Sequence, residues 1–107
     1  MKLLVTGATG FLGGATARRL AREGHDVLGT GRSVAAGKRL EQDGVSFRAA
    51  DVRDADAVRE LCRGREAVVH CAALSAPWGA ASEFESINRL GTQHVVDACR
   101  AAGARRL

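Results

Sequence analysis

The stretch Val5-Thr6-Gly7-Ala8-Thr9-Gly10-Phe11-Leu12-Gly13-Gly14 decides the fold that this sequence predicts. It follows a short apolar run, Lys2–Val5, and precedes a run of good helix formers, Ala15–Glu23, which ends at Gly24. A strand, a glycine-rich turn and a helix in this order form the arrangement that binds a dinucleotide pyrophosphate. We therefore predict a phosphate-binding turn here in preference to a plain glycine-rich turn.

The glycines of this stretch suit the close approach of a phosphate. Gly7 can adopt the backbone angles of a sharp exit from the strand, and Gly13 lets the helix lie close to the strand. Gly10 has no side chain, so a phosphate can approach the unpaired amides at the positive end of the helix dipole. Thr6 and Thr9 offer hydroxyl donors. The predicted cofactor-binding residues of this turn are Gly7, Thr9, Gly10, Phe11, Leu12 and Gly13.

The glycine spacing also carries a resemblance to a known family. Thr6 followed by Gly7-x-x-Gly10-x-x-Gly13 differs from the GxGxxG of most NAD-dependent dehydrogenases and resembles the short-chain dehydrogenase/reductase superfamily. The fuller form, TGATGFLGG, resembles the extended branch of that superfamily, the NAD(P)-dependent epimerase/dehydratase family. The resemblance implies an oxidoreductase that transfers a hydride between a nicotinamide and a carbon bearing a hydroxyl or carbonyl, often on nucleotide sugars or sterol-like substrates.

Length and composition predict one small domain. The chain has 107 residues, of which 46% are hydrophobic, and no apolar run approaches the roughly 20 residues that a membrane span needs. No signal-peptide pattern opens the sequence. The three cysteines lack CxxC or metal-ligand spacing, so we interpret them as small buried residues of a reducing cytoplasm and expect no metal.

The net charge of +4 raises the question of a nucleic-acid partner. Sixteen residues are basic, but most of them are arginines scattered along the chain near acids, as in Arg22-Glu23 and Arg59-Glu60. Aromatic residues make up 4% of the chain, and no basic block interleaves with them. We therefore expect solvated helix faces and neither a nucleic-acid nor a membrane partner.

The residues after the second predicted strand, Val27–Thr30, bear on the cofactor. NAD-binding sites place an acid here, about 20 residues after the glycine turn, to bond the ribose hydroxyls. This sequence instead has Gly31-Arg32-Ser33. Arg32 can meet a 2′-phosphate with two charged hydrogen bonds, and Ser33 can add a hydroxyl. We predict NADP(H) over NAD(H); the alternative is a surface arginine that caps the strand end.

A polar helix over Val34–Asp43, ended by Gly44, and a third strand over Val45–Ala50 are predicted next. Lys38 and Arg39 should face solvent, although either could lend charge to the same phosphate. The strand is followed by Asp51 and Val52. In the resembled family an Asp and an apolar residue at this point contact the adenine, the Asp through the exocyclic amine. Otherwise, Asp51 caps the loop before the next helix.

Asp54 is a good N-cap for a helix over Ala55–Arg63, which Gly64 ends. A near-continuous apolar strand, Glu66–Ala73, follows and is typical of the centre of a parallel sheet. Its end resembles the HxAA motif of the family, which implies that the backbone at Ala72 and Ala73 approaches the cofactor ribose. We assign no chemistry to His70.

A loop over Leu74–Ser82 and a last helix over Ser82–Ala102 complete the pattern. Trp78 in the loop either borders a substrate or covers the edge of the core. Within the helix, Ile87-Asn88-Arg89-Leu90-Gly91-Thr92 resembles the VNxxGT segment of the family. That resemblance gives Asn88 a supporting catalytic role, in which it orients the hydrogen-bond network near the nicotinamide.

The predicted fold class is therefore α/β: a Rossmann-type parallel sheet with flanking helices, incomplete, with about four strands and the start of a fifth at Arg105–Leu107. The sequence contains no Tyr, so the Tyr-x-x-x-Lys pair of the family is absent. We expect either part of a longer enzyme or a chain that relies on a partner for its other half. The alternative is a non-catalytic NADP(H)-binding sensor or interaction module.

Overall fold

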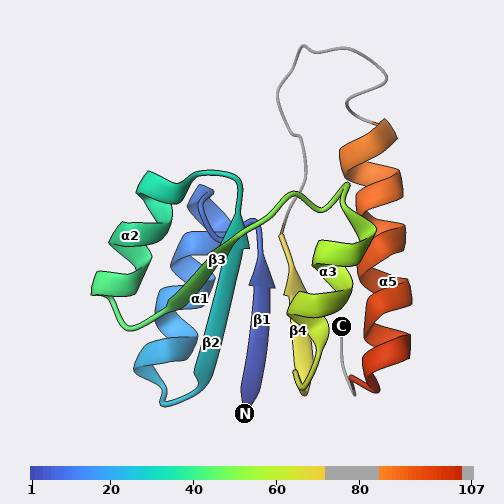
Figure 1. The fold of residues 1–107 in the computed structure, drawn as a ribbon. Helices are drawn as coiled ribbons and strands as arrows, with labels where there is room; N and C mark the ends of the chain where they lie inside the picture. The colour runs from blue at the N-terminus through green and yellow to red at the C-terminus, as the bar shows by residue number, and fades with distance from the viewer. Residues whose placement is uncertain (72–84, 105–107) are drawn as a thin grey trace.

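The computed structural model describes residues 1–71 and 85–104. Its four described strands are β1 (Lys2–Thr6), β2 (Asp26–Gly31), β3 (Ser46–Ala49) and β4 (Ala67–His70). They form one parallel sheet in the order β3-β2-β1-β4 (Figure 1). This arrangement confirms the predicted Rossmann-type α/β class. The chain crosses from β3 on one side of β1 to β4 on the other, so the strand order switches at β1.

Helices link the strands and cover both faces of the sheet. They are α1 (Phe11–Arg22), α2 (Val34–Gln42), α3 (Ala55–Cys62), the π-helical turn η1 (Glu85–Leu90) and α5 (Gly91–Ala102). Helices α1 and α2 lie on one face, and α3 and α5 lie on the other (Figure 1). The carboxyl ends of the strands all reach one edge of the sheet, which is where open α/β sheets bind ligands.

Alternate residues of the strands supply two separate cores. Leu4, Leu28 and Val68 point toward α3 and α5, where they pack with Val58, Leu61, Val95 and Ala98. Val5 and Val27 point toward α1 and α2, where they pack with Ala17, Leu40 and Val45. Successive side chains of a strand face opposite sides, so a strand buried on both faces is almost wholly apolar.

The predicted N-cap of α3 is confirmed, since the Asp54 carboxylate accepts from the Ala57 amide at 3.2 Å. Ser33, which was not predicted as a cap, caps α2 by accepting from the Ala36 amide at 3.2 Å. The glycines predicted to end helices all have positive φ, a conformation that L side chains rarely adopt: Gly24, Gly44, Gly64 and Gly103.

Helix α1 begins before the run of good helix formers that starts at Ala15. It begins at Phe11 and therefore contains Gly13 and Gly14. Both glycines are buried, so packing against the turn outweighs their poor helix propensity. The other described elements agree with the prediction to within one residue at most ends. The predicted positions Ala72, Ala73 and Trp78, and the predicted fifth strand, lie outside the described residues.

The last predicted helix is divided in the structure. Residues Glu85–Leu90 form a π-helical turn, and the α-helix begins at Gly91. A 3.6-residue periodicity does not reveal the extra residue that a π turn contains. The predicted small-residue face of this helix is nevertheless buried at Gly91, Val95 and Ala98.

Two of the three cysteines are buried as expected, Cys62 and Cys99, whereas Cys71 is only partly buried. Burial raises the pKa of the Cys62 thiol to about 12. Arginines form ion pairs with acids, mostly one helical turn away or across elements: Arg18–Asp43, Arg19–Glu23, Arg53–Asp51, Arg59–Asp56, Arg63–Glu60 and Arg65–Asp26. Among the described residues, no helix is both long and apolar enough to cross a bilayer.

Candidate functional site

The glycine-rich turn joins β1 to α1 at the carboxyl edge of the sheet. Gly7 has a φ of 65°, and its carbonyl accepts from the Gly10 amide at 3.0 Å, which closes the turn. The Ala8 amide donates to the carbonyl of Thr30 at 3.0 Å. The turn is therefore held against the end of β2, the strand that precedes Arg32.

The glycines at positions 13 and 10 differ in what surrounds them. A Cβ built on Gly13 would overlap the carbonyl group of Gly7, lying 2.6 Å from its carbon. A Cβ built on Gly10 would meet the Gly7 oxygen at 3.4 Å, an ordinary contact. The fold itself therefore requires glycine at position 13. At position 10 it leaves space, which suits a cradle that a phosphate enters.

The first turn of α1 is open to an anion. Its N-cap residue is Gly10, which offers no side chain, and the first turn contains no acid. The Phe11 side chain is 97% exposed and that of Leu12 is 68% exposed, so neither covers the helix end. Unpaired amides and the positive end of the helix dipole thus face the space beyond the turn.

The two threonines of the turn have different surroundings. Thr9 packs against the end of β2, since a Cβ on Gly31 would lie 2.5 Å from its Oγ1. Thr6 is 1% exposed, and its Oγ1 accepts from the Cys71 amide at 3.0 Å and lies 2.6 Å from His70 Nδ1. The expectation that Thr6 donates to a phosphate was therefore wrong: its hydroxyl is used inside the sheet.

The residues after β2 are exposed beside the turn. Arg32 forms no hydrogen bond or ion pair with any described residue, and the hydroxyl of Ser33 caps α2. The positive charge of Arg32 also contributes to lowering the pKa of Asp51, after the larger effect of Arg53. Arg32 and Asp51, which are distant in sequence, therefore lie close enough to interact at the same edge.

Asp51 is engaged by its own loop. Arg53 Nε donates to both carboxylate oxygens at 3.0 Å, and the Arg53 amide donates to Oδ1 at 3.0 Å. The side-chain hydrogen bonds from Arg53 are the main reason for the lowered pKa of Asp51. The capping interpretation of Asp51 is thus realised, and each oxygen keeps further acceptor capacity. Neighbouring Val52 is buried, and its carbonyl accepts from His94 Nδ1 at 2.9 Å.

A chain of hydrogen bonds connects β1 and β4 to the last helix. His70 lies 2.6 Å from Thr6 Oγ1 through Nδ1 and 3.0 Å from Thr92 Oγ1 through Nε2. The Thr92 hydroxyl donates to the carbonyl of Asn88 at 2.8 Å, so it accepts the proton of His70 Nε2. His70 therefore carries a proton on Nε2, and burial lowers its pKa.

This network gives His70 and Thr92 a structural role that the sequence analysis did not assign. Asn88 is exposed on the π-helical turn, and Thr92 one turn later ties that turn to the end of β4. The spacing of Asn88 and Thr92 within one motif was the available signal. Their pairing with His70 depends on the packing of α5.

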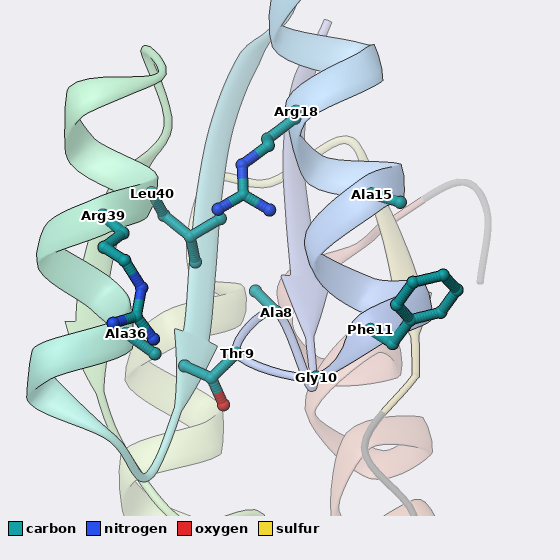
Figure 2. Close-up of a pocket in the computed structure, with 9 residues that line it drawn as sticks. All are labelled: Ala8, Thr9, Gly10, Phe11, Ala15, Arg18, Ala36, Arg39 and Leu40. Atoms are coloured by element: carbon teal, nitrogen blue, oxygen red, sulfur yellow. The ribbon is translucent and has the colours of Figure 1, made fainter.

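A pocket of about 290 Å³ lies between α1 and α2 beside the glycine-rich turn (Figure 2). The turn and residues of α1 and α2 line it: Ala8, Thr9, Gly10, Phe11, Ala15, Arg18, Ala36, Arg39 and Leu40. The predicted residues Thr9, Gly10 and Phe11 therefore share one hollow. Ala36 and Arg18 were not predicted to belong to it.

The chain belongs to the NAD dependent epimerase/dehydratase family, whose model matches residues 3–107. It is 41% identical over 107 residues to a 2-alkyl-3-oxoalkanoate reductase of Stenotrophomonas maltophilia, covering all of this chain and 32% of that protein. It is 34% identical over 112 residues to a UDP-glucose 4-epimerase of Streptomyces lividans, covering 99% of this chain and 34% of that one.

A solved structure agrees in fold with this assignment. A UDP-glucose-4-epimerase from Stenotrophomonas maltophila, with bound NAD and formylated UDP-arabinopyranose, superposes with a TM-score of 0.86 at 25% identity. The match covers 97% of this chain and 34% of that one. The chain thus spans about a third of the length of the relatives that it matches.

Proposed function

We propose that this chain is the NADP(H)-binding part of an epimerase-, dehydratase- or reductase-type oxidoreductase. The observation that carries the proposal is the first turn of α1, whose amides no side chain caps. The turn before it is so close to the helix that only glycine fits at position 13. Membership of the family and the binding of NAD by a solved relative support a nicotinamide dinucleotide as the ligand. The glycine-rich turn would hold its pyrophosphate.

The residues after β2 favour NADP(H) over NAD(H). No acid stands there to bond a free ribose 2′-hydroxyl or to repel a 2′-phosphate. Arg32 is exposed and forms no hydrogen bond or ion pair with a described residue. Its planar fork is suited to two parallel hydrogen bonds with a phosphate, and the Ser33 hydroxyl can still donate while it caps α2.

The remaining predicted residues would position the rest of the ligand. Asp51 and the backbone of Val52 would contact the adenine, Ala72 and Ala73 would border the ribose, and Asn88 would stand near the reacting end. When bound, the nicotinamide supplies the hydride chemistry. We further propose a substrate carbon that bears a hydroxyl or carbonyl, in a nucleotide sugar or a sterol-like compound.

The proton-transfer group of the family would have to come from outside these 107 residues. The sequence holds no Tyr, and its two lysines, Lys2 and Lys38, lie in β1 and α2. The chain by itself is therefore proposed to bind the dinucleotide and to leave the chemical step to residues elsewhere.

Calorimetric titration of the chain with NADPH and with NADH tests the proposal. We expect NADPH to bind about ten- to a hundredfold more tightly, because charged hydrogen bonds to phosphate are worth roughly 1.5–3 kcal/mol. Arg32→Ala should remove that preference. Arg22→Ala, at an exposed arginine in the last turn of α1, is the matched control and should keep it. Equal binding of both dinucleotides, or binding of neither, would contradict the proposal.

A further inference from the structure

The pocket between α1 and α2 has two arginines on its walls, and they are not equivalent. Figure 2 shows Arg18 reaching in from α1 and Arg39 from α2, with Arg39 extending along Ala36 toward the end that Thr9 occupies. Arg18 Nε donates to the Asp43 carboxylate at 2.6 Å, so its charge is largely neutralised. Arg39 forms no hydrogen bond or ion pair with any described residue.

The pocket therefore carries one unbalanced positive charge. That charge lies at the end of the pocket nearest the predicted cofactor residues. Thr9 forms this end and packs on Gly31, the residue immediately before Arg32. Ala36 belongs to the first turn of α2, whose helix dipole is also positive here. Helical spacing puts Arg39, three residues later, on the same face as Ala36.

We propose that Arg39 is a second specificity-determining residue, which binds the 2′-phosphate of NADP(H) at the Thr9 end of this pocket while Arg32 binds it from the end of β2. This inference rests on the proposed function. A phosphate monoester carries about −1.5 to −2 charges at neutral pH, so a single guanidinium leaves it incompletely balanced. A second, unpaired guanidinium approaching from α2 supplies the missing charge.

The neighbouring Lys38 provides a matched control. It is also cationic and exposed on α2, but it does not line the pocket. Arg39→Gln and Lys38→Gln remove the same charge from adjacent positions. Circular dichroism and thermal unfolding establish that both variants keep the fold.

The experiment titrates the wild type and both variants with NADPH, NADH, adenosine 2′,5′-bisphosphate and adenosine 5′-monophosphate. Arg39→Gln should weaken binding of the two 2′-phosphorylated ligands by about tenfold or more. It should leave the other two ligands unchanged. Lys38→Gln should change no ligand by more than about threefold, the size of a general charge effect at an exposed position.

Two results would overturn the inference while the proposed function stands. One is that Arg39→Gln and Lys38→Gln change the affinity for each ligand equally, although the wild type prefers NADPH. The other is an equal loss of NADPH and NADH in Arg39→Gln, which would assign Arg39 to the pyrophosphate shared by both. A wild type that binds neither dinucleotide, or prefers NADH, would overturn the proposed function and this inference together.

Discussion

The carboxyl edge of the sheet has two halves that are built in opposite ways. The open half comprises the Gly7–Gly13 turn, Arg32 and Arg39. It presents the amides of the helix end and two guanidinium groups that form no hydrogen bond or ion pair with a described residue. The closed half comprises Thr6, His70 and Thr92, whose polar atoms bond to one another in a partly buried chain. At the same edge, the polar groups of one half are available to a ligand, and those of the other half are hydrogen-bonded within the protein.

This difference separates binding from support. Polar groups that are taken out of water without partners are costly, so the hydrogen bonds of this partly buried network stabilise one arrangement of β1, β4 and α5. Charged and polar groups exposed without partners cost little and remain available to a ligand. We infer that the open half holds the dinucleotide and that the closed half fixes the π-helical turn on which Asn88 lies.

The largest expected effect distinguishes two glycines of the open half. Gly13→Ala would force a Cβ into the carbonyl group of Gly7, where only backbone could move. We expect a loss of at least about 3 kcal/mol in the free energy of unfolding, at the upper end of overpacking costs. Urea denaturation followed by circular dichroism measures it.

Gly10→Ala is the matched comparison. Gly10 has extended backbone angles, φ −85° and ψ 174°, and an added Cβ meets only the Gly7 oxygen at 3.4 Å. Unfolding should change by less than about 1 kcal/mol, while NADPH binding should weaken at least about tenfold, because the methyl occupies the phosphate approach. Equal stability losses in the two variants would refute the distinction between these glycines.

The next effect compares two buried threonines, Thr6 of the closed half and Thr30 of β2. Thr6 is 1% exposed and serves both the Cys71 amide and His70, whereas Thr30 is 2% exposed and donates to the Arg48 carbonyl at 2.7 Å. Thr6→Val leaves two partly buried groups, the Cys71 amide and the His70 ring, without that partner, so it should cost about 2–3 kcal/mol. Thr30→Val should cost about 1 kcal/mol, and denaturant titration of both variants compares them.

The same two variants can also refute a stabilising role of the closed half. If Thr6→Val proved no more destabilising than Thr30→Val, the network of the closed half would not stabilise the fold beyond an ordinary buried hydroxyl. The role assigned to His70 and Thr92 would then be lost.

The smallest expected effect is a pH dependence that arises from His70. Burial lowers the pKa of His70 in the folded state below the ordinary value of about 6.5. Below pH 6.5 the unfolded chain therefore gains a proton that the folded chain does not, so stability decreases as the pH falls toward the folded pKa. Above about pH 7 the contribution is constant.

Thermal unfolding of the wild type and His70→Gln at several pH values between 5 and 8 tests this dependence. The wild type should lose more stability than the variant as the pH falls, since the remaining titrating groups are common to both. Parallel curves would show that His70 titrates alike in the folded and unfolded states, contrary to the lowered pKa of the folded state.

Local signals predicted much of the fold. The Gly24 and Gly64 helix ends, the Asp54 cap and the two-faced apolar strands all depend on neighbours in sequence, and the structure confirms them. The structure departs from local preference where packing outweighs it. Gly13 and Gly14 join α1 against their propensity because the turn buries them.

The candidate site divides in the same way. The turn, Arg32 and Asp51 were chosen from the sequence, and their placement at one edge follows from the parallel sheet. The contact of Arg53 with Asp51 was not predicted, because several arginines and acids lie within reach of one another along the chain. The adenine contact of Asp51 and the supporting role of Asn88 stay predictions.

The sequence by itself determined the strand–turn–helix unit, because glycine spacing and apolar alternation act over a few residues. Tertiary structure decided which polar groups are hydrogen-bonded within the protein and which remain available to a ligand. Thr6 meets His70 across 64 positions of sequence, and Arg39 reaches the pocket only because α2 packs beside α1. Both outcomes depend on side-chain positions that long-range packing sets, and no local pattern encodes them.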